Sequence, residues 1–315
     1  METELLTYKQ TDNYDPSKTT GLRNAFAANM KRRFNELVKV LITSVVTNDC
    51  FGLTPKPHTL QMNPAQQEAF AFVRSAEKVE LFMKWLQEQV DRGILEVSVF
   101  QQIGSSVDAA WTNLYISDSY KRGVIRARYE LKKAGYDVPT IDQTGGIGVV
   151  MMGPLHVDRL GLLFTRVFND LKGITAAMDM QISRVLAQGI ADGDGMRLLA
   201  RKLVSTINGT KMGELGITDT LGRFIPAQRR ALMLARTEMM RAFNESALVE
   251  FRNWGVLGIN VKAEYSTAKD DRVCPICQPL EGKVFTLDEA SGMLPKHPSC
   301  RCIFLPHIAE IQKYR

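Results

Sequence analysis

The chain has 315 residues, of which 45% are hydrophobic and 23% charged, and its formal net charge is +6 with a pI of about 9.0. This length and composition favour two folded domains with buried cores. The first ten residues, METELLTYKQ, lack the basic region and apolar run of a secretory signal, and no apolar stretch approaches the ~18 residues of a membrane span. We therefore expect neither secretion nor membrane anchoring of its own, and a reducing compartment for the thiols.

The amino-terminal part of the chain shows helical periodicity. Apolar residues recur every three to four positions in three segments, which predicts amphipathic helices over residues 20–47, 63–93 and 118–134. The second segment has the clearest ends, because Asn63 can cap it, Pro64 suits its first turn and Gly93 stops it.

The helical pattern breaks at YDVPTIDQTGGIGVVMMGP, residues 136–154, which is rich in glycine and proline. Its GGIG is not a phosphate-binding loop, because the third glycine of GxGxxG would fall on Met151 and no Lys-Ser/Thr follows. We interpret residues 141–155 as a linker. It separates a helical domain of residues 1–140 from a second domain of residues 156–315.

The second domain mixes both kinds of element. Helical patterns predict helices over residues 156–171, 174–190, 194–207 and 226–255. Three short stretches that read as strands follow: INVKAEYST, GKVFTL and CRCIFLP. The predicted fold class is α+β, predominantly α, with a small carboxy-terminal sheet in a subdomain of about residues 256–305.

Four of the five cysteines and one of the four histidines lie between Arg272 and Cys302. CPIC has the spacing of a zinc knuckle, and HPSCRC offers a second half-site. The candidate metal ligands are Cys274, Cys277, His297, Cys300 and Cys302. A closed tetrahedral site needs four of the five, so Cys302 and His297 compete for the last position. The loop between the half-sites is poor in apolar residues, so we expect structural Zn²⁺ to close this subdomain.

Other chemistries fit the cysteines less well. A thioredoxin-like pair would leave the second half-site without a role. A zinc deaminase has proline before its first cysteine, where Val273 stands, and an upstream His-x-Glu, which His156-Val157-Asp158 only imitates. We assign no catalytic residue, and we assign no chemistry to the remaining cysteine and histidines, Cys50, His58, His156 and His307.

Basic residues concentrate in residues 31–34, 121–133 and 227–241, all within helical patterns. We interpret them as solvated helix faces. No aromatic residues are interleaved as base-stacking platforms require, so a groove for single-stranded nucleic acid is not indicated.

Three motifs in order resemble the phage head-morphogenesis family typified by the F protein of phage Mu. They are ARTEMMRAFNESAL (residues 235–248), STAKDDRVCPICQPLEGKVF (266–285) and HPSCRC (297–302), and the resemblance covers about residues 170–305. Within the first motif, we hypothesise that Arg236 or Glu238 fastens this helix to the zinc subdomain. Either residue would reach toward the strand that carries Glu264 or the loop that carries Asp270 and Asp271.

The resemblance implies a minor capsid protein without enzymatic activity that acts at the portal vertex during procapsid assembly. Its implied partners are the portal protein and the scaffold or major capsid protein, and we expect the helical domain of residues 1–140 to dock on the portal or scaffold. The resemblance also allows contact with packaged double-stranded DNA. It implies a place in the virion, inside the capsid near the portal vertex, and in the host cytoplasm during assembly. Two alternatives stay open: a zinc-containing DNA-binding module, and a metal-dependent nuclease or transferase in which His297 acts as a base.

Overall fold

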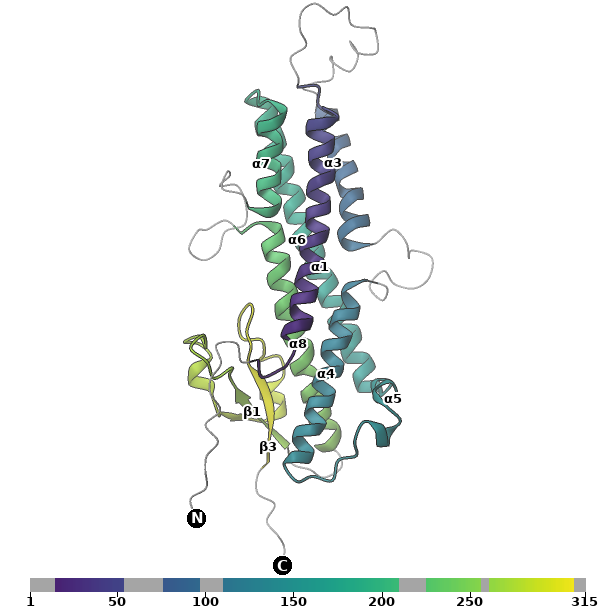
Figure 1. Cartoon of the computed structure of the whole chain (residues 1–315), viewed down its shortest axis with the longest axis vertical. Coiled ribbons are helices and arrows are strands. Elements are labelled where there is room, and N and C mark those ends of the chain that lie inside the picture. The colour runs from purple at the N-terminus through teal and green to yellow at the C-terminus, as the bar shows by residue number, and fades with distance from the viewer. Residues whose placement is uncertain (1–14, 54–75, 97–109, 210–224, 256–260, 309–315) are drawn as a thin grey trace, which may run out of the picture. The chain divides into compact units, whose positions relative to one another are not determined.

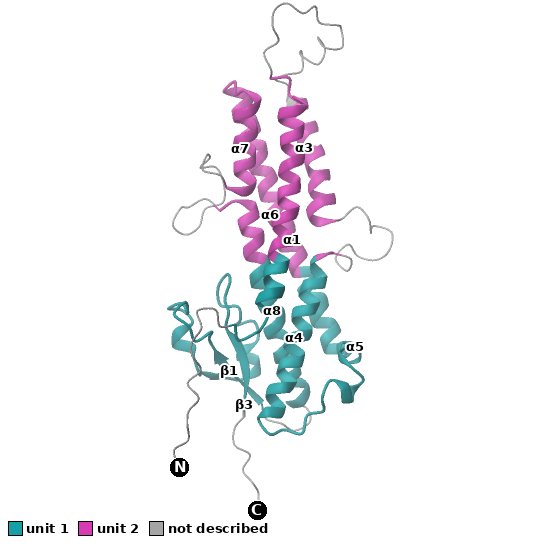
Figure 2. Cartoon of the chain, in the orientation of Figure 1, with its two compact units in different colours: residues 1–26, 112–165, 235–315 teal, residues 27–111, 166–234 magenta. Residues whose placement is uncertain are grey.

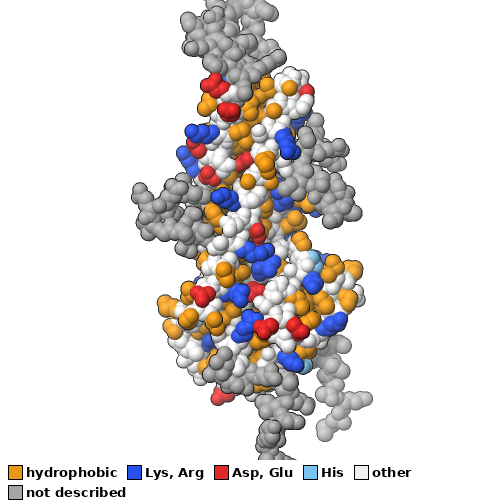
Figure 3. All heavy atoms as spheres, turned by 180° about the vertical axis from the view of Figure 1, so that it is seen from behind, with side chains coloured by type: hydrophobic (Ala, Val, Ile, Leu, Met, Phe, Trp, Pro, Cys, Tyr) orange, Lys and Arg blue, Asp and Glu red, His pale blue; other side chains and the backbone are white. Residues whose placement is uncertain are grey.

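The structure is a computed structural model, which describes residues 15–53, 76–96, 110–209, 225–255 and 261–308. Long helices and one three-stranded sheet make up the described part (Figure 1), so the predicted predominance of helix is confirmed. None of the described helices combines the length and apolarity that a membrane crossing needs. On the face drawn in Figure 3, basic, acidic and apolar side chains are interspersed.

The chain forms two compact units, each built from several segments of sequence (Figure 2). Unit 1 holds residues 1–26, 112–165 and 235–315, and unit 2 holds residues 27–111 and 166–234. The helices α1, α6 and α8 contribute residues to both units. The predicted division into 1–140, 141–155 and 156–315 is a division of the sequence into continuous pieces, and it stays a prediction.

The first helix follows its periodicity. Helix α1 spans Thr20–Ile42 and continues as a π-helical turn, Thr43–Thr47, which confirms the helix predicted over residues 20–47. Its residues at three-to-four spacing are buried: Phe26, Met30, Phe34, Leu37, Leu41 and Val45. The apolar stripe therefore decides both the element and its length.

Helix α3, Ala76–Val90, lies in the second predicted helix, whose predicted start at Asn63 falls outside the described residues. The predicted stop at Gly93 is wrong, since a π-helical turn, Asp91–Leu95, carries the chain past it. Ile94 and Leu95 are buried, and this burial outweighs the roughly 1 kcal/mol that a helical glycine costs.

Helix α4 spans Thr112–Lys133 and begins six residues before the predicted Asp118. Thr112, Asn113 and Ile116 are buried, so packing extends the helix through a polar stretch that periodicity does not recognise. Its end is as predicted, because Gly135 adopts the left-handed conformation with φ of 95°.

The segment predicted as a linker contains a 3₁₀ turn, Asp142–Thr144, and a short helix α5, Ile147–Met151. Helix α6 then runs without a break over Pro154–Ala191, where the sequence predicts two helices separated near Gly173. A Cβ at Gly173 would meet no atom within 4 Å, so the glycine only weakens the helix slightly. The buried side chains on either side of it, Leu171 and Met178, hold the helix straight through.

The next two helices match their predictions closely. Helix α7 spans Met196–Asn208 and helix α8 spans Ala227–Gly255. Between α6 and α7 the chain turns at Gly193, which has a positive φ of 75°.

All three predicted strands form one sheet. They are β1, Val261–Ser266, β2, Val284–Phe285, and β3, Ile303–Ile308. The order is β2-β1-β3, and both neighbours of β1 run antiparallel to it. A short helix α9, Leu287–Ala290, follows β2. The sheet therefore brings the chain just after β1 close to the chain just before β3, which are the two cysteine-bearing segments.

Candidate metal centre

The metal-ligand candidates stand on two similar tight turns. After β1, the N–H of Cys277 donates to the carbonyl of Cys274 at 3.0 Å, and before β3 the N–H of Cys300 donates to the carbonyl of His297 at 3.1 Å. The N–H of Cys277 also lies 3.3 Å from the Cys274 Sγ. Each turn thus presents two donor side chains three residues apart on one side of the backbone, as zinc knuckles do.

The structure brings all five predicted ligands together. The Nε2 of His297 lies 3.1 Å from the Cys274 Sγ and 3.3 Å from the Cys277 Sγ, and the Sγ atoms of Cys277 and Cys300 are 3.9 Å apart. The donor atoms form two groups in which every pair lies within 4.8 Å: Cys274, Cys277 and His297; and Cys277, Cys300 and Cys302. Cys277 belongs to both groups and is the centre of the cluster.

These distances suit a tetrahedral zinc ion. Bonds of about 2.3 Å to sulfur and about 2.0–2.1 Å to nitrogen place two sulfurs about 3.8 Å apart and a sulfur and a nitrogen about 3.5 Å apart. The contacts of His297 with the two thiols, and of Cys277 with Cys300, lie within a few tenths of an ångström of these values. The donor set of thiols and one imidazole is also the set that zinc prefers.

The thiols differ in how readily they ionise. Hydrogen bonding from Cys302, opposed by burial, lowers the pKa of the Cys300 thiol to about 5. Burial raises the pKa of Cys277 to about 11. At Cys274 burial also acts upward, but hydrogen bonds from Cys277 outweigh it and leave the pKa below its usual range. Hydrogen bonding with Cys300, together with burial, raises the pKa of Cys302. The cluster therefore places two thiols with lowered pKa values beside two with raised ones, and a bound cation would favour the thiolate form of each.

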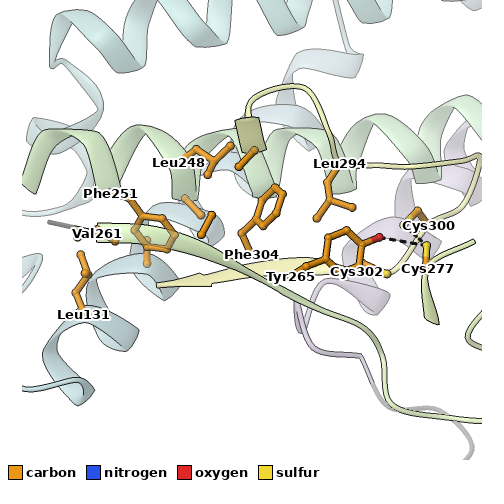
Figure 4. Packing of buried hydrophobic residues seen from close by; sticks show 14 of the residues in the cluster. Leu131, Leu248, Phe251, Val261, Tyr265, Cys277, Leu294, Cys300, Cys302 and Phe304 are labelled. Carbon is orange, nitrogen blue, oxygen red and sulfur yellow. Dashed lines mark hydrogen bonds between the residues drawn. The ribbon is translucent and has the colours of Figure 1, made fainter. Parts of the chain in front are cut away.

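The cluster rests on a small apolar core (Figure 4). Tyr265, from β1, is fully buried, packs edge-on against Phe304 of β3, and donates its hydroxyl to the Cys277 Sγ at 3.2 Å. Leu294 packs in the same cluster from the loop that precedes the second turn. Sequence reasoning missed Tyr265, although its place in an alternating strand 12 residues before Cys277 marks it as an inward-facing residue.

Helix α8 holds the second turn through polar contacts. The Thr237 hydroxyl accepts the N–H of Ser299, which has a positive φ of 60° between His297 and Cys300. Asn244 donates its amide to the carbonyl of Cys302 at 3.1 Å and accepts the N–H of Phe304 at 3.0 Å. These contacts fix the backbone from which the second half-site is presented.

The hypothesis for Arg236 and Glu238 names the wrong partners. Asp270 forms a bidentate ion pair with Arg301, whose two terminal guanidinium nitrogens lie 2.6 and 2.7 Å from the carboxylate oxygens. These hydrogen bonds lower the pKa of Asp270. Glu238 pairs with Arg241 one turn along its own helix. The residue between the two, Thr237, makes the link to the metal loop that they were expected to make.

A second polar cluster lies away from the thiols, on α4, α6 and α8. The fully buried carboxylate of Glu250 accepts hydrogen bonds from Arg128 and from Trp254 and contacts the Nε2 of His156, all at 2.9 Å. The Nδ1 of His156 lies 3.1 Å from the hydroxyl of Tyr120. His156 therefore contributes to the hydrogen bonding of a buried carboxylate, and it belongs to neither group of metal-ligand candidates.

The other residues without assigned chemistry lie apart from the cysteine cluster or outside the described residues. Cys50 is half-buried, and burial raises the pKa of its thiol. His307 lies on β3 with its Nδ1 3.5 Å from a carboxylate oxygen of Glu264. His58 falls outside the described residues.

Comparison with known proteins adds one finding. Residues 180–305 match the family model described as Phage Mu protein F like protein. No curated protein and no solved structure matches the chain. The matched segment is less than half of the chain, and it holds all of α8, the strands β1 and β2, the first three residues of β3 and all five metal-ligand candidates. Residues 180–305 are therefore similar to the Phage Mu protein F like family, and the resemblance that the three sequence motifs indicate is confirmed.

Proposed function

We propose that the protein is a structural minor head protein of a phage, which acts at the portal vertex during procapsid assembly and has no catalytic activity. The single observation that carries this proposal is the family match over residues 180–305. The portal protein and the scaffold or major capsid protein are the proposed partners. The proposed place is the inside of the capsid near the portal.

A reconstruction of the particle that contains the chain tests this proposal. Density for the described helices at one unique vertex, found without imposed icosahedral averaging, is the expected result. Density spread equally over all vertices, or heads that assemble normally without the chain, would contradict the portal role.

The proposed cofactor is one structural Zn²⁺ bound by Cys274, Cys277, His297 and Cys300. The two matching turns support this set, because each contributes two donors with the same three-residue offset and the same backbone hydrogen bond. Cys302 follows the second turn at the start of β3, and Asn244 holds its carbonyl. Its buried thiol lines the site without completing the tetrahedron.

Metal analysis of single variants separates this set from its alternative. Cys300→Ser is expected to lose stoichiometric zinc, whereas Cys302→Ser retains one zinc per chain; Cys50→Ser is the matched control outside the cluster. X-ray absorption is expected to report three sulfur ligands and one nitrogen. Zinc retained by Cys300→Ser but lost by Cys302→Ser would replace Cys300 with Cys302 in the ligand set.

The contacts of the His297 imidazole do not favour the enzymatic alternative, in which this residue acts as a base. Its Nδ1 lies 3.0 Å from the carbonyl of Pro298, and its Nε2 faces the thiols of Cys274 and Cys277. A ring whose two nitrogens are both engaged is oriented as a metal ligand rather than as a proton acceptor for substrate. Cleavage of DNA by the purified protein that disappears in His297→Ala, with zinc content intact, would restore that alternative.

A further inference from the structure

Unit 2 carries an open groove of about 580 Å³ between helix α7 and the end of α1 with the π-helical turn that follows it. Its apolar lining consists of Ile42 and Val46 on the α1 side and of Ala200 and Val204 on the α7 side. The volume lies within the range of about 300–1,000 Å³ that is usual for binding sites. The two sides are far apart in sequence, so only the fold assembles the groove.

Two cations flank this apolar lining on the α7 side. Arg197 and Arg201, one helical turn apart, line the groove and are exposed. Neither forms an ion pair within the described part of the chain. The Nε of Arg201 donates to the carbonyl of Arg197 at 3.4 Å, which keeps this guanidinium beside the helix. None of the described lining residues is acidic, so the groove favours an occupant that brings carboxylates together with an apolar side chain.

The helical walls restrict the form of that occupant. The backbone groups of a helix are already hydrogen-bonded within it, so the walls offer side chains only. An extended peptide would bury unpaired backbone groups here, whereas a helix satisfies its own. From Arg197 to Val204 the groove follows α7 for about 10 Å, at 1.5 Å per residue. The geometry therefore selects a short stretch of amphipathic helix with an acidic border.

Helix α3, in the same unit, presents such a surface. Its Leu81 is 62% exposed, although leucine is usually buried. Glu77, one turn before Leu81, and Glu80, next to it, are both exposed and form no ion pair within the described residues. Lys84 is the one cation among the exposed residues of α3 and lies a turn further on. Residues 77–81 thus combine an apolar side chain with two carboxylates, which complements the groove.

The groove and this face of α3 are available to different molecules. The neighbour of Leu81, Phe82, is buried with its ring centroid 5.0 Å from that of Phe51, so α3 packs on its own unit through Phe82 and keeps Leu81 exposed. In the view of Figure 1, α7 and α3 lie on opposite sides of α1. One copy can therefore offer its groove to one neighbour and its α3 to another.

We propose that the groove binds helix α3 of a second copy of this chain. Leu81 of that copy packs between Ile42 and Val204, and its two glutamates pair with Arg197 and Arg201. The interface joins two different surfaces, so it is heterologous, and a series of copies closes as a ring where the rotation allows. The contact is small, so the association is weak: burial of Leu81 supplies affinity and the charges set the register. The inference depends neither on the metal nor on the portal role.

Sedimentation velocity of the full-length, zinc-loaded protein at increasing concentration tests the proposal. The wild type is expected to associate reversibly and more weakly as salt is added, because the ion pairs at the rim are screened. Arg197→Glu/Arg201→Glu and Glu77→Lys/Glu80→Lys each place like charges across the contact, and each should raise the Kd of association at least about tenfold. A wild type that stays monomeric up to about 0.5 mM would overturn the proposal.

Mixing the two charge-reversal variants gives the sharper test. In the equimolar mixture, α3 of the first variant and the groove of the second are both unchanged, and the two reversed surfaces are complementary to each other. Association should therefore return to the wild-type level. A mixture that stays as monomeric as its components would contradict the contact between α3 and the groove.

Two further variants control for packing and for net charge. Leu81→Ala should weaken association several-fold with an unchanged melting temperature of the monomer, because Leu81 is exposed there. Lys172→Glu/Arg184→Glu reverses two exposed cations of unit 2 that do not line the groove and should associate as the wild type does. Circular dichroism checks that every variant is folded. An equal loss of association in the Lys172/Arg184 variant would assign the effect to net charge and overturn the proposal.

Discussion

Helix α7 and the candidate metal-binding loops, residues 271–300, are held by different forces. In α7, six of 13 residues are buried, and its apolar face of Leu199, Leu203 and Ile207 is fully enclosed. Among residues 271–300, only Cys277, Ala290, Leu294 and Cys300 are buried, and two of these are cysteines. Unit 2 can therefore rely on the hydrophobic effect, whereas the loops need another source of stability.

The sheet and the loops differ in what stabilises them. β1 and β3 are joined by a regular antiparallel ladder of six residue pairs, which needs no metal. The segment between β1 and β3 has one two-residue strand and one 3₁₀ turn, Gln278–Leu280, besides α9. Its conformation depends on side-chain contacts with α8, on the Asp270–Arg301 ion pair, and on the donor cluster itself.

Removing the proposed metal is expected to give the largest difference in stability between α7 and the loops. Structural zinc contributes roughly 10–16 kcal/mol of apparent binding free energy in finger peptides. A strong chelator should therefore abolish the hydrogen-exchange protection of residues 271–302 and leave that of α7 in place. Unchanged protection in the loops would show that they hold their fold without an ion.

Glu250→Ala is expected to have the next largest effect. The substitution leaves Arg128 buried without its carboxylate, and losing one partner of a buried pair costs about 3–5 kcal/mol. Thermal and denaturant unfolding measure the loss, while zinc content should stay at one per chain. Asp288→Ala, which removes an exposed partner of Arg252, serves as the control and should leave the midpoint unchanged.

The same carboxylate gives a pH dependence. Burial acts to raise the pKa of Glu250, but hydrogen bonds from His156 and Arg128 outweigh it and hold the pKa below 4.5. A carboxyl with a depressed folded-state pKa stabilises the fold above its unfolded value, and this contribution is lost as the pH falls through the folded value. The difference in melting temperature between the wild type and Glu250→Gln should therefore shrink below pH 4.5. A difference that grows on acidification would contradict the assignment.

Leu203→Ala tests the helical region alone. Leu203 is fully buried on α7, and truncation of a buried leucine costs about 2–5 kcal/mol, depending on how far the cavity collapses. We expect a lower midpoint of unfolding with zinc binding retained. Arg201→Ala, at an exposed position of the same helix, provides the matched control.

Thr286→Ala is expected to have the smallest effect. Thr286 caps α9 in a capping box, in which its hydroxyl accepts the N–H of Glu289 and its own N–H donates to the Glu289 carboxylate at 2.8 Å. Loss of such a cap costs about 1 kcal/mol. Amide exchange in α9 should increase with no change in α7, and Thr286→Ser should restore the protection.

Sequence periodicity predicted the elements where one face is apolar over its whole length. α1 and α8 agree with their predicted bounds within a few residues, because each has a continuous buried stripe or clear Pro and Gly boundaries. The predictions failed where burial overrides local preference: at Gly93 and Gly173 inside helices, and at the polar start of α4. In each case a glycine or polar residue costs about 1 kcal/mol or less, which packing of its neighbours exceeds.

The five ligand candidates were predictable because two closely spaced donor pairs leave few other chemical explanations for the residues. Tyr265, Thr237 and Asn244 were not, since each acts through a partner remote in sequence. The same holds for Glu250, whose environment comes from three helices.

The amino-acid sequence by itself determined the helices with regular apolar periodicity, the three strands, the candidate donors of the metal centre and the family motifs. Only the tertiary structure decided that the two cysteine turns meet and that Arg301 rather than Arg236 pairs with Asp270. The physical reason is the distance along the chain over which each kind of interaction acts. Periodicity and turn chemistry act over a few residues, whereas charge pairing, burial and metal coordination depend on distances in space that the sheet and helices set.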